Sequence, residues 1–262
     1  MSSGPPTDAS NAWNVEEERF LYVPPRDLQG PDGPLLSKDE SHHALRVWRL
    51  RKGDRVRGID GEGNEFLVVI GESLGRRVQL QIEDSRPSSR EFPWDISLGM
   101  PLLHRSSRLD WILEKATELG VRKIQPIVTQ RTTVIPVEER LPKRLERWER
   151  VIISAMKQSG RAWRPRLEPP SDLESLLSRC GDRRIVWAVP SGERLPSGET
   201  LRHDGNGTFL ALVGPEGGWE EEEEEQLRGV PGWAVSLGPH RLRSETAVVN
   251  LLSLLQDRLL AT

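Results

Sequence analysis

Short apolar runs separated by Gly, Asp and Pro occupy the first third of the chain, between residues 20 and 82. Residues 55–60, 66–70 and 77–82 form three such runs, and the last alternates strictly between apolar and polar positions. A glycine-containing turn, residues 61–64, separates the first two. This spacing predicts a small β-barrel or sandwich, preceded by a short helix over residues 41–48 with Ser41 as its cap.

The apolar period changes beyond residue 93. Apolar positions three and four apart, such as Leu109, Ile112, Leu113 and Ala116, predict a helix over residues 107–119 that ends at Gly120. Three further helices are predicted at 142–158, 220–228 and 245–260, and they alternate with strands at 95–100, 123–128, 184–189, 209–213 and 233–237. Such alternation is typical of an α/β fold with a mostly parallel sheet covered on both faces.

Composition changes along the chain and divides it into segments. Residues 1–16 are rich in Ser, Pro and small residues, which predicts a mobile tail. The β-rich domain is expected over 17–88, and residues 83–93, with two prolines and three serines, are the predicted linker. The α/β domain is expected over 93–262.

The sequence argues against a membrane protein, a disulfide-bonded protein and a metalloprotein. The apolar run 247–255 is far shorter than the ~20 residues of a membrane-spanning helix. No basic segment followed by an apolar one opens the chain, so we expect a cytoplasmic location. Cys180 is the single cysteine, which excludes a disulfide framework and an all-cysteine zinc site. His42 and His43 are distant in sequence from the other histidines, so no metal is expected.

Charge is segregated although the net charge is only −3. Residues 42–57 hold six Lys or Arg and one Asp, and residues 140–166 hold nine Lys or Arg and two Glu. Such stretches suit phosphate contacts, although ordinary solvated faces look the same. Residues 216–225 hold seven glutamates, and the six from 220 to 225 are interpreted as a solvated helix face.

Two glycine turns follow predicted strands near the end of the chain. Gly214-Pro-Glu-Gly-Gly-Trp follows the strand at 209–213, and Gly238-Pro-His-Arg-Leu-Arg-Ser follows the strand at 233–237. Glycine permits positive φ and lets backbone amides approach a ligand. Ligands of parallel sheets bind beyond the carboxyl ends of the strands. Neither turn matches a dinucleotide fingerprint or a P-loop.

Together the segments 212–218 and 237–247 resemble the signature of the RsmE family, bacterial methyltransferases of the SPOUT superfamily that methylate N3 of a uridine in 16S ribosomal RNA. Segments 108–121, 158–161 and 43–47 fit the same family, and the resemblance covers residues 20–259. It implies a SPOUT domain with a C-terminal trefoil knot and an N-terminal PUA-like RNA-binding domain. It also implies S-adenosylmethionine as cofactor, a homodimer, and a task in ribosomal RNA processing during ribosome biogenesis.

The resemblance also implies the cofactor site, in the knot loops. One departure is His240, at a position where relatives often carry Arg. The residues implied to bind the cofactor are Val189, Pro190, Leu212, Val213, Gly214, Glu216, Gly217, Gly218, Leu237, Gly238, Pro239, Leu242, Arg243, Thr246 and Ala247.

Methylation of uracil N3 requires that the N3 proton leaves or that cations stabilise the charge on the neighbouring carbonyl oxygens. Arginine suits the second task, and Arg243, Arg161 and Arg105 are the catalytic candidates in the motifs. Glu245, like Glu216, either accepts the proton or orients the cofactor or an arginine, and we favour the orienting role.

The basic stretch of the first domain supplies the candidate phosphate contacts, Arg46, Arg49, Arg51 and Arg55. Two alternatives stay open at this point. One is a SPOUT methyltransferase that acts on another base or on a ribose 2′-hydroxyl. The other is a non-catalytic RNA-binding assembly factor.

Overall fold

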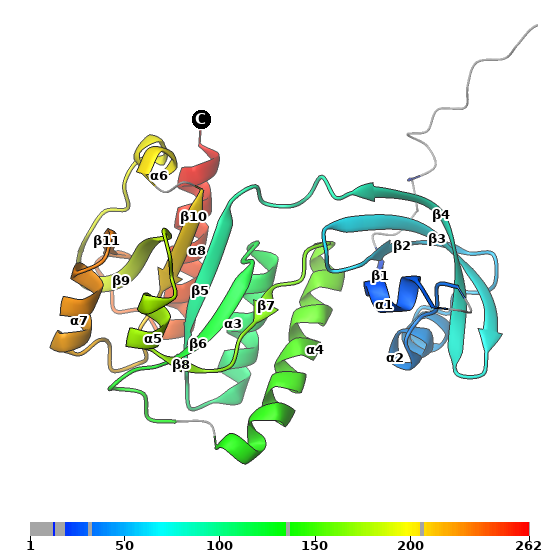
Figure 1. Cartoon of the computed structure of the whole chain (residues 1–262), viewed down its shortest axis with the longest axis horizontal. Helices are drawn as coiled ribbons and strands as arrows, with labels where there is room; N and C mark the ends of the chain where they lie inside the picture. Colours follow the sequence, from blue (N-terminus) through cyan, green and yellow to red (C-terminus); the bar gives the residue numbers. More distant parts are fainter. Residues whose placement is uncertain (1–12, 14–18, 31–32, 135–136, 205–206, 262) are drawn as a thin grey trace, which may run out of the picture. The chain divides into compact units, whose positions relative to one another are not determined.

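The computed structural model describes residues 13, 19–30, 33–134, 137–204 and 207–261 (Figure 1). The chain forms two compact units. Unit 1 comprises residues 1–91 together with 156–164, and unit 2 comprises 92–155 and 165–262. Both units are therefore discontinuous in sequence, because a short segment from the middle of the chain belongs to unit 1.

Unit 1 contains a four-stranded sheet in the order β1-β2-β3-β4 (Figure 1). Strand β1 runs parallel to β2, whereas the β2–β3 and β3–β4 pairs are antiparallel. Two short helices and a π-helical turn complete the unit. The bounds are β1 Phe20–Tyr22, α1 Pro25–Leu28, α2 Lys38–His42, η1 His43–Val47, β2 Arg55–Ile59, β3 Asn64–Leu74 and β4 Arg77–Pro87.

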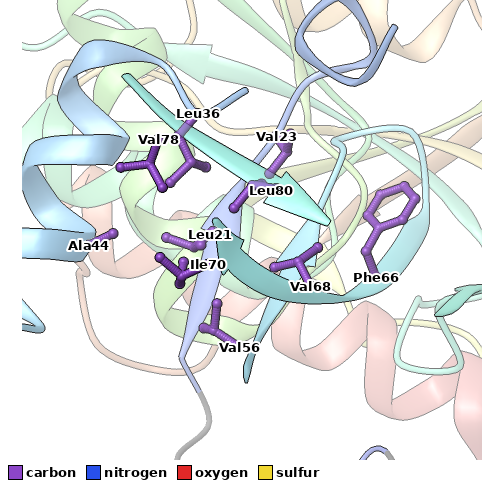
Figure 2. Close-up of a cluster of buried hydrophobic side chains, with 10 residues drawn as sticks. All are labelled: Leu21, Val23, Leu36, Ala44, Val56, Phe66, Val68, Ile70, Val78 and Leu80. Atoms are coloured by element: carbon purple, nitrogen blue, oxygen red, sulfur yellow. The ribbon is translucent and has the colours of Figure 1, made fainter. Parts of the chain in front are cut away.

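The core of unit 1 lies between the sheet and the segment around α2. Figure 2 shows its apolar side chains converging from the strands, from η1 and from the stretch before α2. Burying such side chains removes apolar surface from water, which stabilises the unit by about 25 cal/mol per Å². The cluster consists of Leu21, Val23, Leu36, Ala44, Val56, Phe66, Val68, Ile70, Val78 and Leu80.

Two local expectations for unit 1 are wrong. Ser37 caps α2 by accepting the Glu40 N–H at 3.1 Å, whereas the buried Ser41 hydroxyl accepts the Val78 N–H at 3.0 Å and joins the helix to β4. The expected linker 83–93 begins inside a strand, because β4 continues to Pro87 as the partner of β3.

The expected mobile tail lies outside the described residues except for Trp13. This side chain is buried, and its indole Nε1 donates to Asp84 at 2.8 Å. The Arg86 guanidinium lies 3.8 Å from the centre of its ring. Trp13 is therefore held against β4, which contradicts a mobile tail at this position.

The segment 156–164 joins unit 1 through ionic and close contacts. Lys157 Nζ, near the end of α4, lies 2.7 Å from Glu40 Oε1. Gly160 follows with φ of +68°, and a Cβ at this position would lie 2.7 Å from a carbon of the Phe20 ring. The glycine is thus required twice, by its backbone conformation and by the ring against it.

Unit 2 contains a parallel sheet in the order β11-β9-β10-β5-β6-β7, and β8 also pairs with β6 (Figure 1). Every strand pair in this sheet is parallel among the described residues, as the alternation of strands and helices predicts. The strands are β5 Asp95–Pro101, β6 Lys123–Val128, β7 Arg166–Leu167, β8 Ser171–Asp172, β9 Arg184–Glu193, β10 Thr208–Leu212 and β11 Gly232–Val235.

The predicted helices of unit 2 are present, and α3 packs against α8. The apolar side of α3 is buried as expected, and Gly120 ends the helix with φ of +74°. Helices α5 and α6 are too short for their periods to be visible in the sequence. The bounds are α3 Ser106–Glu118, η2 Glu138–Arg140, α4 Leu141–Ser159, α5 Leu173–Ser178, α6 Gly198–Asp204, α7 Glu221–Arg228 and α8 Ser244–Leu260.

The described helices include none that is long and apolar enough to cross a membrane. The trefoil knot stays a prediction of the family resemblance.

We predict that Gly160→Ala destabilises the protein more than Gly181→Ala. Both glycines have positive φ, but a Cβ at Gly181 meets nothing within 4 Å. Both variants therefore carry a left-handed strain of about 1–2 kcal/mol, and only Gly160→Ala adds about 1–3 kcal/mol of overpacking against Phe20. Urea unfolding measures both free energies. Equal losses would show that the Phe20 contact does not constrain this position.

Candidate functional site

A cavity of about 750 Å³ opens at the carboxyl ends of β9, β10 and β11 in unit 2. Residues 188–190 of β9 line it, together with residues 213–219 after β10 and residues 236–242 after β11. These three strands are neighbours in the sheet, so the second half of β9 and the loops after β10 and β11 meet at one place. Both glycine turns singled out by the sequence border this cavity.

Most of the residues expected to bind a cofactor line this cavity. There are three exceptions. The Leu212 side chain is buried in the sheet. The side chains of Arg243 and Thr246 are exposed, although the residues next to them in sequence, Leu242, Ser244 and Ala247, line the cavity. The expected residues that line it are Val189, Pro190, Val213, Gly214, Glu216, Gly217, Gly218, Leu237, Gly238, Pro239, Leu242 and Ala247. His240, the departure from the family pattern, lines it as well.

Two glycines keep the cavity open and its wall closely packed. Gly238 has φ of +118°, and a Cβ there would meet no atom within 4 Å. A side chain at this lining position would therefore occupy space that a ligand needs. A Cβ at Gly214 would lie 3.2 Å from the Trp219 ring, whose Nε1 donates to Ala188 O at 3.1 Å. Trp219 thus fixes the β10 loop against the end of β9.

Arg131, in the loop after β6, holds the β10 loop from its other side. Its Nε and Nη2 donate to the two carboxylate oxygens of Glu220 at 2.7 and 3.0 Å, and its Nη1 donates to Gly217 O at 2.6 Å. These hydrogen bonds favour the ionised carboxylate and lower the pKa of Glu220. No motif indicated Arg131, because its partners lie almost ninety positions away in the sequence.

Glu223 shows that the glutamate run is more than a solvated face. Its side chain is buried, and Oε1 accepts the Gln130 N–H at 2.8 Å while Oε2 accepts the Glu220 N–H at 2.9 Å. The run therefore ties the start of α7 to the loop after β6 and supports the same wall of the cavity.

A second cavity of about 340 Å³ lies on the other side of the β10 loop. Leu102, Leu103 and His104 after β5 line it, with Thr133 after β6. Both cavities have Arg131 and residues 215–217 in their linings. The loop after β10 therefore borders both cavities.

Arg108, on α3, forms ion pairs with both carboxylates that the motifs singled out. It contacts Glu216 through Nη1, and its Nε lies 3.4 Å from Glu245 Oε1. The other oxygen of Glu245 is buried and has no hydrogen-bond partner within the described part of the chain. This arrangement favours the orienting role expected for the two glutamates. Arg108 belongs to a quoted motif, yet the sequence did not indicate its function.

The three candidate catalytic arginines lie in different surroundings. Arg243 and Arg105 are exposed and directly precede α8 and α3, respectively, and neither belongs to the lining of the two described cavities. Arg161 belongs to unit 1, where its side chain is 6% exposed and its Nε lies 3.4 Å from Glu91 Oε2. Its burial and its pair with Glu91 give Arg161 a structural role within unit 1, whereas Arg243 and Arg105 are open to solvent.

The candidate RNA-binding arginines all belong to unit 1. Arg46, Arg49 and Arg51 have exposed side chains around the turn between η1 and β2. Arg55 is exposed too, but its Nε lies 2.8 Å from Glu83 Oε2. A phosphate at Arg55 would therefore compete with a carboxylate that is already present. Among the described residues, no three His, Cys, Asp or Glu side chains are grouped so that they could hold a metal ion.

Two family models match the chain and follow the two units. A model described as an RNA methyltransferase domain matches residues 90–256, and one described as an RNA methyltransferase PUA domain matches residues 36–83. The first match covers the parallel sheet with both cavities, and the second covers most of the unit 1 sheet.

Curated relatives agree over nearly the whole chain. Ribosomal RNA small subunit methyltransferase E of Aquifex aeolicus (strain VF5) is 31% identical over 223 residues, which are 85% of this chain and 93% of the relative. The protein of the same name from Bacillus subtilis (strain 168) is 28% identical over 250 residues, which are 89% of this chain and 93% of the relative.

Solved structures are similar over the same extent. A ribosomal RNA small subunit methyltransferase E from Neisseria gonorrhoeae, bound to S-adenosyl methionine, has a TM-score of 0.78 and 29% identity, covering 91% of this chain and 97% of that one. A Legionella pneumophila protein in complex with the cofactor SAM has a TM-score of 0.77 and 28% identity, covering 91% and 96%. The chain belongs to the RNA methyltransferase family that includes ribosomal RNA small subunit methyltransferase E, which is the family that its two glycine turns resemble.

Proposed function

We propose that the protein is an S-adenosylmethionine-dependent methyltransferase that methylates N3 of a uridine in 16S ribosomal RNA. The observation that carries this proposal is the glycine-lined cavity at the ends of β9, β10 and β11, in a chain related to ribosomal RNA small subunit methyltransferase E. The choice of N3 follows from the RsmE resemblance of the motifs.

The first cavity fits the cofactor in size and in chemistry. A volume of about 750 Å³ lies within the range of small-molecule sites, and both apolar and polar residues line the cavity. Gly217, Gly218 and Gly238 leave the backbone accessible there, while Val189 and Leu237 offer apolar contacts. When bound, the cofactor supplies an electrophilic methyl group.

Charged residues near the cavity are proposed to bind the uracil and stabilise its negative charge. Arg243 is proposed to stabilise the negative charge on the uracil, since its exposed side chain begins between the lining residues Leu242 and Ser244. Arg105, which directly follows His104 of the second cavity, is proposed to face the same substrate. Glu245 acts as a positioning residue, because it pairs with Arg108.

Unit 1 is proposed to bind the RNA backbone through Arg46, Arg49 and Arg51. Arg55 is proposed to join them by replacing its ion pair with Glu83 by a phosphate contact. A cytoplasmic location accords with a ribosomal substrate.

The family resemblance also motivates a homodimer, which sedimentation equilibrium would detect as a species of twice the 29.7 kDa chain mass. A chain-mass species alone at micromolar concentration would contradict the dimer.

The modified nucleoside tests the reaction itself. Unmodified 16S ribosomal RNA is incubated with the protein and with S-adenosylmethionine that carries a labelled methyl group, and nuclease digests are examined by mass spectrometry. We expect the label in N3-methyluridine. A labelled 2′-O-methyl nucleoside would contradict the assignment and support another SPOUT activity, whereas cofactor binding without any label in RNA would support an assembly factor.

Substitution of Gly238 tests the cofactor site. Gly238→Val places a branched side chain in the open cavity, so we expect cofactor affinity to fall at least about tenfold in calorimetry. Gly53→Val is the control, because Gly53 also has positive φ with no atom within 4 Å of a Cβ but belongs to unit 1. Unchanged affinity for the Gly238 variant would place the cofactor elsewhere.

Substitution of two arginines tests the RNA contacts of unit 1. The variant with Arg46→Ala and Arg51→Ala should bind RNA more weakly, and the slope of log affinity against log salt should flatten by roughly 0.7–0.9 per lost phosphate contact. Cofactor affinity should stay the same, because both residues lie outside the cavity lining. An unchanged salt slope would show that these arginines do not contact phosphate.

A further inference from the structure

The second cavity adjoins the first, which is where the acceptor of a methyl group from a donor in the first cavity would have to lie. The strand order places β10, β5 and β6 side by side, and the loops after these three strands line the second cavity. The first cavity is lined by residues 188–190 within β9 and by the loops after β10 and β11. Because β10 is common to both sets, the two cavities adjoin at residues 215–217, which line both.

The lining of the second cavity suits a flat base with polar edges. Leu102 and Leu103 are buried side chains that offer an apolar surface. His104 contributes ring nitrogens and Thr133 a hydroxyl group. RNA-modifying enzymes that act on a base take it out of the stack and bind its edge by hydrogen bonds. A volume of about 340 Å³ accommodates one pyrimidine and not a second nucleotide-sized cofactor.

We propose that the second cavity binds the acceptor uracil and that the Glu216 carboxylate accepts a hydrogen bond from its N3–H. This inference rests on the proposed function and names the residues that select its substrate. Uracil presents two carbonyl oxygens with the N3–H donor between them, and an ionised carboxylate is purely an acceptor. Glu216 lines both cavities, so a base bound to its carboxylate lies beside the cofactor cavity.

Donors for the two carbonyl oxygens are available in the same lining. The Thr133 hydroxyl is one, and the Arg131 guanidinium is another. Glu220 and Gly217 engage three of the five N–H groups of Arg131 in the described part of the chain, which leaves two for a ligand. The cavity thus offers the donor, acceptor, donor pattern that complements uracil.

This pattern discriminates against cytosine. N3 of cytosine carries a lone pair and its N4 carries a donor, so a carboxylate opposite N3 would face an acceptor and gain no hydrogen bond from it. A site built to bind a particular donor rejects the analogue that lacks it. Arg108 holds the Glu216 carboxylate through its ion pair, while 54% exposure of the Glu216 side chain keeps it open to an incoming base. Arg108 therefore acts as a positioning residue for base selection.

Nucleotide binding tests the site without methyl transfer. The full-length protein, saturated with S-adenosylhomocysteine, is titrated with uridine 5′-monophosphate and cytidine 5′-monophosphate in NMR. We expect the uridine nucleotide to bind at least about tenfold more tightly. In Glu216→Gln the two affinities should agree within about twofold, because an amide both donates and accepts. Glu221→Gln, an exposed glutamate of α7 outside both linings, should keep the wild-type preference.

Methylation kinetics separate this inference from the proposed function. Thr133→Val and His104→Ala should raise KM or lower kcat for the RNA about tenfold with cofactor affinity intact, whereas His203→Ala, exposed on α6, should change neither. Equal affinity of the wild type for both nucleotides, or normal kinetics of the two cavity variants, would overturn the inference while the methyltransferase stands. Absence of methyl transfer by a wild type that selects uridine nucleotide would refute the proposed function and leave the base site intact.

Discussion

The Arg131 guanidinium is the contact on which both cavities depend. It joins the loop after β6 to the loop after β10 by a two-pronged pair with Glu220 and a hydrogen bond to Gly217 O. Loops pay a conformational entropy cost when they are ordered, and charge-assisted hydrogen bonds are among the few local interactions strong enough to offset it. These contacts join the lining of both cavities to the loop after β6.

The two cavities that share this loop differ in the residues that line them. The first cavity has glycines where a ligand needs backbone and space, whereas the second has leucines, a histidine and a threonine. Glu216, held by Arg108, belongs to both. On the proposed assignment, a donor and an acceptor held in adjoining cavities gain effective concentration without any covalent chemistry by the protein, since positioning alone converts a bimolecular step into an intramolecular one.

The sequence was sufficient for those features that depend on neighbouring residues. The 3.6-residue period of α3 and its stop at Gly120 come from local pattern, as do the strands that precede both glycine turns. The two turns placed the first cavity for the same reason. Arg131, Arg108 and the second cavity were not predicted, because their assembly depends on the order β10-β5-β6, which local periodicity does not contain.

The Gln158-Ser-Gly-Arg segment shows the opposite case, in which a visible motif has a packing role that the sequence did not indicate. Its arginine is buried against Glu91, and its glycine lies under the Phe20 ring, so both residues support unit 1. Burial and steric contact between residues this distant in sequence leave no periodic trace. A motif thus locates residues that matter and leaves open whether packing or chemistry requires them.

The central claim is that the cavities on either side of the β10 loop hold the methyl donor and the acceptor base. A crystal structure with S-adenosylhomocysteine and a uridine-containing fragment of 16S ribosomal RNA tests it directly. The account predicts the cofactor product between residues 213–219 and 236–242, and uracil beside Leu103 and Thr133 with N3 next to the Glu216 carboxylate. Uracil bound outside the second cavity, with the cofactor product in place, would contradict it.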